Sequence, residues 1–361
     1  MDDPQGKLRT PQAKSRGRWI AGALIVGLCL GFAISQEYYL KTYARGGDAI
    51  VPAWATRRQS RETGGTAQPN KELRRILKRI APKKEVMIAI SNANLLKEQT
   101  LATWLKAVQR LNFNNWLIVA IDEELRDYCK EHGINHYYRP VKIPKTQAGT
   151  GDNHAISSMK FEILEEFLTL GWSVLLSDVD VLVVQNPFDH LKRDSDVEGM
   201  SDGFDDLTAY GGTYGVDDPS MGWSRYAEGY RHMAMNSGLF YLRAGPRTLD
   251  LMRRIARRVT TEHVWDQTAY NQEMFRLSNG DYVSPQVAVR VMDIDLFMNS
   301  KRLFKFVRHL PQDQQKLPVM VHINYHPEKT ERLMAAYQYF IEGDKEALSP
   351  WADGSGRAQS T

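Results

Sequence analysis

The sequence predicts an α/β fold in which a mostly parallel central sheet is flanked by helices. Short apolar runs typical of buried strands alternate with segments whose apolar residues recur at helical spacing, in the order β-α-β-α-β-α-β. Polar residues follow the first and fourth of these strands directly, which is where open α/β sheets bind ligands. The chain has 361 residues, 42% of them hydrophobic and 25% charged, so it can bury a sizeable core.

Each element is expected from a local pattern. Strands are expected over residues 86–90, 116–121, 136–138 and 173–177. Helices are expected over residues 95–111, over residues 123–132 with Gly133 closing the helix, and from a cap at Asp152 to Gly171. From about Asp202 the alternation is lost, and shorter strands between Gly-rich turns predict a mixed second half built onto the same sheet.

An uncharged apolar segment at residues 19–35 predicts a transmembrane signal anchor. Basic residues dominate the segment before it, so we expect the N-terminus in the cytosol and the folded part in the lumen. A cleaved signal peptide is the alternative interpretation, because Ala33 and Ser35 provide small residues at a cleavage site. The basic tail of residues 1–18 is long for a signal peptide, which favours the uncleaved anchor.

The composition divides the chain into five parts. They are a cytosolic tail (1–18), the transmembrane anchor (19–35), a stem or linker (36–83), the folded domain (84–348) and a flexible C-terminal tail (349–361). The stem is rich in Gly, Pro and Arg and cannot bury enough apolar surface to fold. At its end, Leu73, Ile76, Leu77 and Ile80 have helical spacing and mark a candidate start of the globular region.

Charge is unevenly distributed along the chain. Residues 1–83 hold 16 Lys and Arg against 6 Asp and Glu, whereas the remainder from Lys84 has a net charge of −6. The folded part therefore lacks the clustered cations of a nucleic-acid-binding surface, and no nucleic-acid partner is expected. Cys29 lies in the apolar segment and Cys129 in a polar helical stretch, so we do not expect them to pair.

Asp178-Val179-Asp180 directly follows the fourth strand. In an extended segment the two carboxylates point to one face and would repel each other unless a cation lies between them. A divalent ion such as Mn²⁺ or Mg²⁺ prefers oxygen ligands and can also hold a diphosphate. The alternative is a strand that ends in a solvated acidic turn. The apolar runs on both sides favour the metal site, because buried strands rarely carry unpaired acids.

Other polar positions are candidates with ordinary structural alternatives. His322 ends an apolar strand and becomes a third metal ligand if it meets the acidic pair; otherwise it is a core or rim histidine. Lys329 follows and suits a phosphate contact or a solvated surface position. Asn236-Ser237-Gly238 precedes a strand and predicts either a close ligand approach or a plain turn.

Asp266 and Gln267 open an expected helix. Asp266 therefore has the alternative of a first-turn acid or an N-cap. Lys160 lies in a helix whose other residues form an apolar face, and a solvated lysine is the default expectation for it.

Several longer stretches occur in order between about Glu85 and Leu348. They are AISSMK (155–160), SDVDVLVVQNPF (177–188), RDSDVE (193–198), MSDG (200–203), NSGLFYL (236–242), WDQ (265–267), VMD (291–293), FMNSK (297–301) and VHINYHP (321–327). With Ser91 and Asn92 after the first strand, they resemble the GT-A glycosyltransferase pattern. More closely, the chain resembles the plant and green-algal arabinosyltransferases of glycosyltransferase family 77, of the "reduced residual arabinose" type.

The resemblance implies a GT-A-like single Rossmann-type domain and a metal-dependent, retaining enzyme of the Golgi membrane. It implies UDP-β-L-arabinofuranose as donor and arabinosylated hydroxyproline of extensin-like cell-wall glycoproteins as acceptor. The implied roles are as follows: catalysis by Asp178, Asp180, Asp266 and Gln267; metal binding by Asp178, Asp180 and His322, with Mn²⁺ favoured over Mg²⁺; phosphate contact by Lys329; sugar contacts by Lys160, Asn236, Ser237 and Gly238; and uridine contacts by Ser91 and Asn92.

Two other functions remain open from the residues alone. The same fold can use another UDP-sugar, as in a galactosyl- or xylosyltransferase, because a few pocket side chains decide which sugar binds. A membrane-anchored sugar-binding protein without turnover would bind UDP-sugars with metal but form no product.

Overall fold

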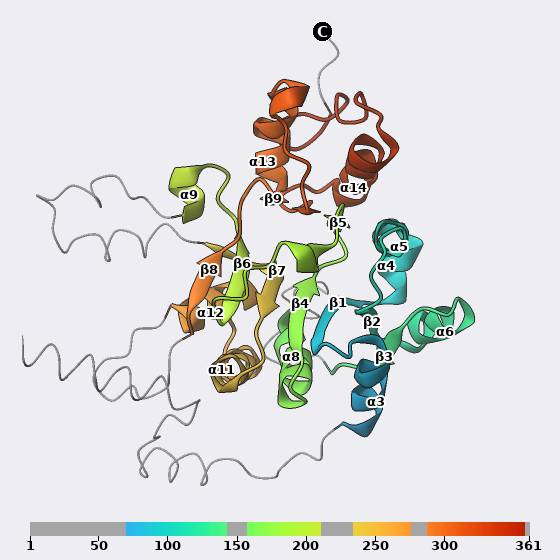
Figure 1. Cartoon of the computed structure of the whole chain (residues 1–361), viewed down its shortest axis with the longest axis vertical. Helices are drawn as coiled ribbons and strands as arrows, with labels where there is room; N and C mark the ends of the chain where they lie inside the picture. Colours follow the sequence, from blue (N-terminus) through green and yellow to red (C-terminus); the bar gives the residue numbers. More distant parts are fainter. Residues whose placement is uncertain (1–69, 143–156, 211–233, 276–286, 358–361) are drawn as a thin grey trace, which may run out of the picture. The chain divides into compact units, whose positions relative to one another are not determined.

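The computed structural model describes residues 70–142, 157–210, 234–275 and 287–357, which fall in one compact unit, Gln68–Thr361. Its main sheet has the strand order β3-β2-β1-β4-β7-β6-β8 (Figure 1). The strands are β1 (Glu85–Ser91), β2 (Trp116–Ala120), β3 (His136–Tyr138), β4 (Ser173–Ser177), β6 (Val197–Ser201), β7 (Met235–Leu242) and β8 (Val289–Val291).

The sheet is mostly parallel, as the sequence predicts. Pairing is parallel from β3 through β2 and β1 to β4, antiparallel on both sides of β7, and parallel between β6 and β8. Among the described strands of this sheet, β7 alone therefore runs against the others. The second half of the chain adds β6, β7 and β8 to the same sheet, which confirms the predicted mixed extension.

Helices cover both faces of the sheet. Val86 and Ile88 of β1 belong to one apolar cluster, and Met87 and Ala89 belong to another. Because successive side chains of a strand point to opposite faces, the two clusters lie on the two sides of the sheet. The first side is covered by α3 (Lys71–Ile80), α8 (Lys160–Thr169), α11 (Pro246–Thr261) and α12 (Asp266–Met274), and the second by α4 (Ala93–Lys97), α5 (Thr100–Gln109) and α6 (Glu123–Glu131).

Two expected helices differ from the observed ones. The helix expected over residues 95–111 is divided into α4 and α5, because Gln99 has a left-handed backbone (φ 70°) that interrupts the hydrogen-bond ladder. In the helix expected to begin at Asp152, the described part is α8, which begins at Lys160; Asp152 itself lies outside the described residues. Gly133 and Gly171, predicted to end helices, both have positive φ angles.

A second, smaller sheet has the order β5-β10-β9, with β5 (Val181–Val183) antiparallel and β9 (Phe297–Asn299) parallel to β10 (Met320–His322). It packs with α13 (Ser300–Lys305) and α14 (Lys329–Tyr337) into a third apolar cluster. The remaining short elements are α9 (Asp206–Tyr210), η2 (Pro187–Asp189), η4 (Val307–His309), η5 (Gln312–Gln314) and η6 (Gln338–Glu342). Three residues connect β4 to β5, so the chain passes from one sheet to the other within a single turn.

The folded unit is longer at both ends than the domain expected over residues 84–348. Helix α3 lies within the expected stem, and its buried Leu73 and Leu77 belong to the core. At the other end Trp351 is buried, and the fully buried Arg332 donates to the carbonyls of Ala352, Gly354 and Gly356. The part of the expected tail up to residue 357 therefore packs against α14.

The expected anchor at residues 19–35 lies outside the described residues. Within the part of the chain that the structure describes, no helix has the length and apolar character needed to cross a bilayer.

One carboxylate joins two helix N-termini at the carboxyl ends of β1 and β2. Asp122 accepts from the Leu125 amide of α6 at 2.8 Å and from the Ala93 amide of α4 at 2.9 Å. We expect Asp122→Ala to lower the free energy of unfolding by about 2 kcal/mol, because it leaves both amides without their acceptor. Urea denaturation measures the change. The control Asp127→Ala removes an exposed ion pair with Arg126 and should cost less than about 1 kcal/mol; equal losses would contradict the capping role.

Candidate active site

Asp178 and Asp180 lie in the connection between β4 and β5. The Val181 amide donates to the Asp178 carbonyl at 3.2 Å, so this connection is a turn and the predicted extended conformation is wrong. The turn is required because the chain changes sheets here. The predicted convergence is nevertheless correct, since ligand atoms of Asp178, Asp180 and His322 all lie within 4.8 Å of one another.

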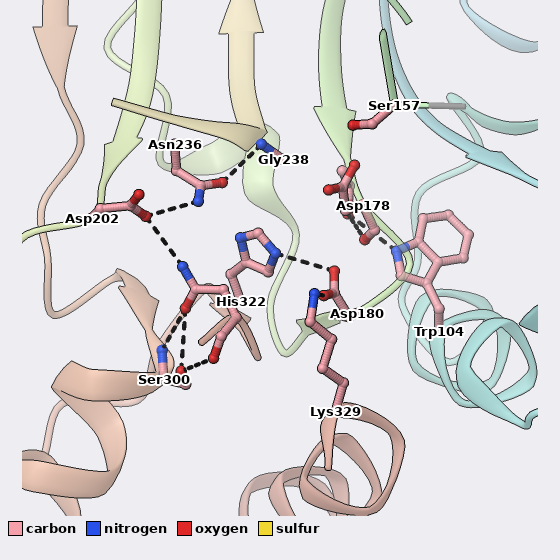
Figure 2. A network of polar contacts seen from close by, with 12 residues as sticks. Trp104, Ser157, Asp178, Asp180, Asp202, Asn236, Gly238, Ser300, His322 and Lys329 are labelled. Carbon is pink, nitrogen blue, oxygen red and sulfur yellow. Dashed lines mark hydrogen bonds and ion pairs between the residues drawn. The ribbon is translucent and has the colours of Figure 1, made fainter. Parts of the chain in front are cut away.

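His322 and Gly238 complete this junction from two other strands. His322 is the last residue of β10, opposite Val181 of β5, and its Nε2 lies 3.1 Å from Asp180 Oδ1 (Figure 2). Gly238 lies inside β7 rather than in a turn. A Cβ at that position would lie 2.4 Å from Asp178 Oδ2 and 2.6 Å from His322 Cε1. Glycine therefore permits the acid and the imidazole to approach each other.

Positive charges lie close to the two acids, of which Asp180 is buried and Asp178 half-buried. Lys329, the first residue of α14, extends its Nζ to 2.7 Å from Asp180 Oδ2. Burial opposes ionisation of Asp180, but the charges of His322 and Lys329 hold the pKa of this carboxyl below its usual range. Burial raises the pKa of Asp178, the negative charge of Asp180 adds to this rise, and Lys160 opposes it. The two acids therefore have different environments although they are two residues apart.

The donor set of this junction is compatible with a divalent cation. Two carboxylates and one imidazole suit Mn²⁺ or Mg²⁺, and donor type does not distinguish the two ions. No residue that the structure describes donates a hydrogen bond to the side chain of Asp178, so its oxygens retain capacity for a ligand. The buried Nδ1 of His322 likewise has no hydrogen-bond partner among the described residues.

Lys160 is buried, which corrects the expectation of a solvated lysine. It is 3% exposed, and its Nζ lies 2.7 Å from Asp266 Oδ2. The same oxygen accepts hydrogen bonds from Ser157 and Ser237, each at 3.0 Å. Burial alone would raise the pKa of Asp266, but Lys160 and the two hydroxyls hold it below its usual range. Asp266 is the first residue of α12 and not its cap, so the first-turn interpretation is correct and the N-cap interpretation is wrong.

Asp202 is a site residue that the sequence did not single out. Its carboxylate accepts from Asn236 Nδ2 at 2.8 Å, from Asn324 Nδ2 at 3.1 Å and from Gln267 Nε2 at 2.6 Å. It therefore joins two predicted residues, Asn236 and Gln267, that lie on β7 and α12. The one available signal is its place in the MSDG stretch at the end of β6.

This polar network continues to α13. Asn324 accepts from the Ser300 amide at 3.3 Å and from the Ser300 hydroxyl at 3.2 Å. Figure 2 shows His322 between this network, which includes Asp202, and the pair Asp178 and Asp180. Two sets of polar groups therefore face each other across one histidine.

A cavity of about 700 Å³ opens beside the acidic pair. Ser91 and Asn92 line it at the end of β1, and Asp178, Asp180 and Lys329 line it near the junction. Asn92 also has a structural function, since its Oδ1 accepts from the Leu95 amide and caps α4. The volume is in the range of pockets that bind small molecules and cofactors.

Comparisons with known proteins agree with this geometry. The family model described as nucleotide-diphospho-sugar transferase matches residues 111–334. Arabinosyltransferase RRA2 of Arabidopsis thaliana is 43% identical over 287 residues, which cover 79% of this chain and 67% of that protein. Arabinosyltransferase RRA1 of the same plant is 38% identical over 299 residues, which cover 81% of this chain and 74% of that protein.

The chain is therefore a glycosyltransferase. It belongs to the nucleotide-diphospho-sugar transferase family, in the group that contains RRA1 and RRA2. The resemblance predicted from the sequence motifs is confirmed.

Solved structures of glycosyltransferases are more distant. The galactosyltransferase LgtC, solved with donor and acceptor sugar analogues, is 14% identical with a TM-score of 0.43, covering 71% of this chain and 96% of that one. Mouse xyloside xylosyltransferase 1 is 13% identical with a TM-score of 0.40, covering 66% of this chain and 98% of that one. At these scores the likeness carries no information on function.

The close approach at Gly238 can be tested by adding one methyl group. We expect Gly238→Ala to weaken Mn²⁺ binding at least about tenfold, because the Cβ displaces Asp178 or His322 and misplaces a ligand. Isothermal titration calorimetry measures the affinity. Gly245→Ala is the matched control, since the nearest atom to its Cβ would be 4.0 Å away. Unchanged affinity in Gly238→Ala would show that the cation binds elsewhere.

Because Lys160 and Asp266 form a buried ion pair, we expect that the stability losses caused by substituting each of them do not add. We expect Lys160→Met to lower the free energy of unfolding by about 3 to 5 kcal/mol, because it leaves the Asp266 charge buried without its cation. Adding Asp266→Asn should recover most of that loss. Urea denaturation of both single variants and the double variant measures the coupling; simple addition of the two losses would show that the pair does not interact.

Proposed function

We propose that the chain is a metal-dependent, retaining arabinosyltransferase. Its donor is UDP-β-L-arabinofuranose, and its acceptor is arabinosylated hydroxyproline of extensin-like cell-wall glycoproteins. The observation that carries the proposal is the convergence of Asp178, Asp180 and His322 beside the 700 Å³ cavity, in a chain 43% identical to a protein named as an arabinosyltransferase. The acceptor class rests on the motif resemblance.

The residues at the junction suit the binding of a nucleoside diphosphate with its cation. Asp178, Asp180 and His322 would hold the cation, which would neutralise charge on the departing diphosphate. Lys329 adds a positive charge to the same cavity wall, near the place where phosphate oxygens would lie. Ser91 and Asn92, which line the same cavity at the end of β1, are candidates for contacts with the uridine.

The acids beyond the junction suit positioning rather than proton transfer. Asp266 is neutralised by Lys160, and Asp202 accepts hydrogen bonds from three amide groups. Both carboxylates are therefore engaged in orienting neighbouring side chains. This arrangement supports a front-face route in which the acceptor hydroxyl attacks on the side from which the diphosphate leaves. The anomeric C–O bond to phosphate breaks, the new glycosidic bond forms, and the leaving phosphate takes the hydroxyl proton, with catalysis supplied by positioning and charge.

The proposal includes a single-pass type II anchor in the Golgi membrane, with the catalytic domain in the lumen. Its support is the apolar segment at residues 19–35 and the basic residues that precede it. A fusion of residues 1–69 to a fluorescent protein should remain in carbonate-washed Golgi membranes; release into the soluble fraction would contradict the anchor.

Loss of one acidic ligand should abolish transfer. We expect Asp180→Asn to lower the turnover of the full-length chain at least about 100-fold, because a neutral amide binds a divalent cation weakly. Chelator should reproduce the loss, and added Mn²⁺ or Mg²⁺ should restore activity in the native chain but not in the variant. UDP release and the product linkage, determined by NMR, are the measurements. Asp189→Asn, an exposed acid nine residues further on, is the control.

The donor is tested with a panel of UDP-sugars on the same hydroxyproline-arabinoside peptides. We expect the highest kcat/KM for UDP-arabinofuranose, and the same kcat/KM values in the Asp189→Asn control as in the native chain. A higher value for UDP-galactose or UDP-xylose would replace the proposed sugar but keep the reaction class. Metal-dependent UDP-sugar binding without any product would favour a sugar-binding protein, and activity of Asp180→Asn in chelator would refute the mechanism.

A further inference from the structure

Aromatic rings and a lysine gather next to the Asp202 network. We define the aromatic platform as Phe204, Lys301, Phe306 and Tyr325. Phe204 and Phe306 are stacked with centroids 5.6 Å apart and planes at 17°. Lys301 Nζ lies 3.8 Å from the centroid of Tyr325 and 5.9 Å from that of Phe204. Tyr325 and Phe306 are 40% and 37% exposed. Lys305 Nζ lies 6.0 Å from the centroid of Phe204, and Arg302 Cζ lies 5.7 Å from that of Phe306.

The platform is fixed to the polar network of the site. Each of three platform residues follows a network residue in the sequence: Phe204 follows Asp202 by two positions, Lys301 follows Ser300, and Tyr325 follows Asn324. Tyr325 Oη also donates to the Asp202 carbonyl at 3.0 Å. The buried Asn299 donates to the carbonyls of Ser201 at 3.1 Å and Gly203 at 2.6 Å. The rings are therefore held beside Asp202 in a defined orientation.

Tyr325 has a backbone conformation that a bulky residue rarely adopts. Its φ of 68° lies in the left-handed region, which costs about 1 to 2 kcal/mol for a residue with a Cβ. The hydrogen bond to Asp202 and the cation over the ring hold it there. Strained residues of this kind are concentrated at binding and active sites.

We propose that the aromatic platform binds the terminal sugar of the acceptor. An acceptor hydroxyl must reach the donor sugar, so the acceptor has to bind next to the residues that surround that sugar, and Asp202 connects the two sets. Exposed aromatic faces carry partial negative charge and accept the C–H groups of a sugar ring, while Lys301 provides a donor for a hydroxyl oxygen. This inference rests on the proposed function, since it assigns the acceptor subsite of that reaction.

A glycan is the occupant that this composition favours. Three cations, Lys301, Lys305 and Arg302, lie over platform rings, and Arg302 also pairs with Asp295. A sugar can use the aromatic faces and these donors together, whereas an anion would use the cations alone. An extended peptide without sugar would instead pack its proline side chains between the rings. The test therefore compares arabinosylated and sugar-free hydroxyproline peptides.

The experiment removes the ring without straining the backbone. Tyr325→Gly suits the positive φ, so the variant should fold. With the full-length chain, we expect the KM for a mono-arabinosylated hydroxyproline peptide to rise about tenfold or more, and the KM for UDP-arabinofuranose to rise much less. Tyr325→Phe keeps the ring and should restore most of the acceptor affinity. Leu317→Ala, an exposed apolar residue elsewhere, is the matched control and should leave both KM values unchanged.

Saturation-transfer NMR with methyl β-L-arabinofuranoside provides a readout that does not depend on turnover. The glycoside protons should receive saturation from the native chain and lose most of it in Tyr325→Gly. An equal acceptor KM in Tyr325→Gly and the native chain, or an equal defect in Tyr325→Phe, would overturn the platform. Preference for the sugar-free peptide would also overturn it. A native chain that binds the glycoside but transfers no arabinofuranose would instead refute the proposed function and leave the platform supported.

Discussion

The close approach of two carboxylates, one buried and one half-buried, is the constraint on which the site depends. Asp178 and Asp180 are separated by one residue, and the burial of a charge such as that of Asp180 costs several kcal/mol unless an opposite charge meets it. The fold meets this cost by bringing Lys329 and His322 to Asp180 and Lys160 towards Asp178. Lys329, His322 and Lys160 come from α14, β10 and α8, so three different elements supply the partners of the acidic turn.

The acids of the site differ in how far their oxygens are already occupied. Asp202 accepts from three amides and Asp266 Oδ2 accepts from Lys160 and two hydroxyls, so both orient their neighbours. Asp178 accepts no side-chain or backbone hydrogen bond from any described residue through its carboxylate. The acid with unused oxygens is the one that gains most from a bound cation. Asp202 and Asp266 therefore fix the geometry of the site, whereas Asp178 has oxygens that can bind a ligand.

The sequence predicted the features that depend on neighbours along the chain. The β-α alternation, the turn glycines and the position of the acidic pair after β4 all follow from local patterns. It did not reveal Asp202, or that Lys160 is buried, because both facts depend on partners 34 to 122 residues away that tertiary folding brings together. The conformation of the acidic turn was also missed, since the small sheet that forces it pairs β5 with β10, more than 130 residues apart in the sequence.

The pairing of β5 with β10 also brings the C-terminal part of the chain to the acidic pair. β10 places His322 opposite Val181, and a slip of one residue in this register would turn the imidazole to the other face of the small sheet. Beyond β10, Lys329 begins α14, and Arg332, one turn further along the same helix, is enclosed by the carbonyls of residues 352, 354 and 356. The C-terminal segment therefore fixes the helix that presents a cation to Asp180. Packing by residues that the sequence assigns to a flexible tail therefore helps to hold one charge of the site in place.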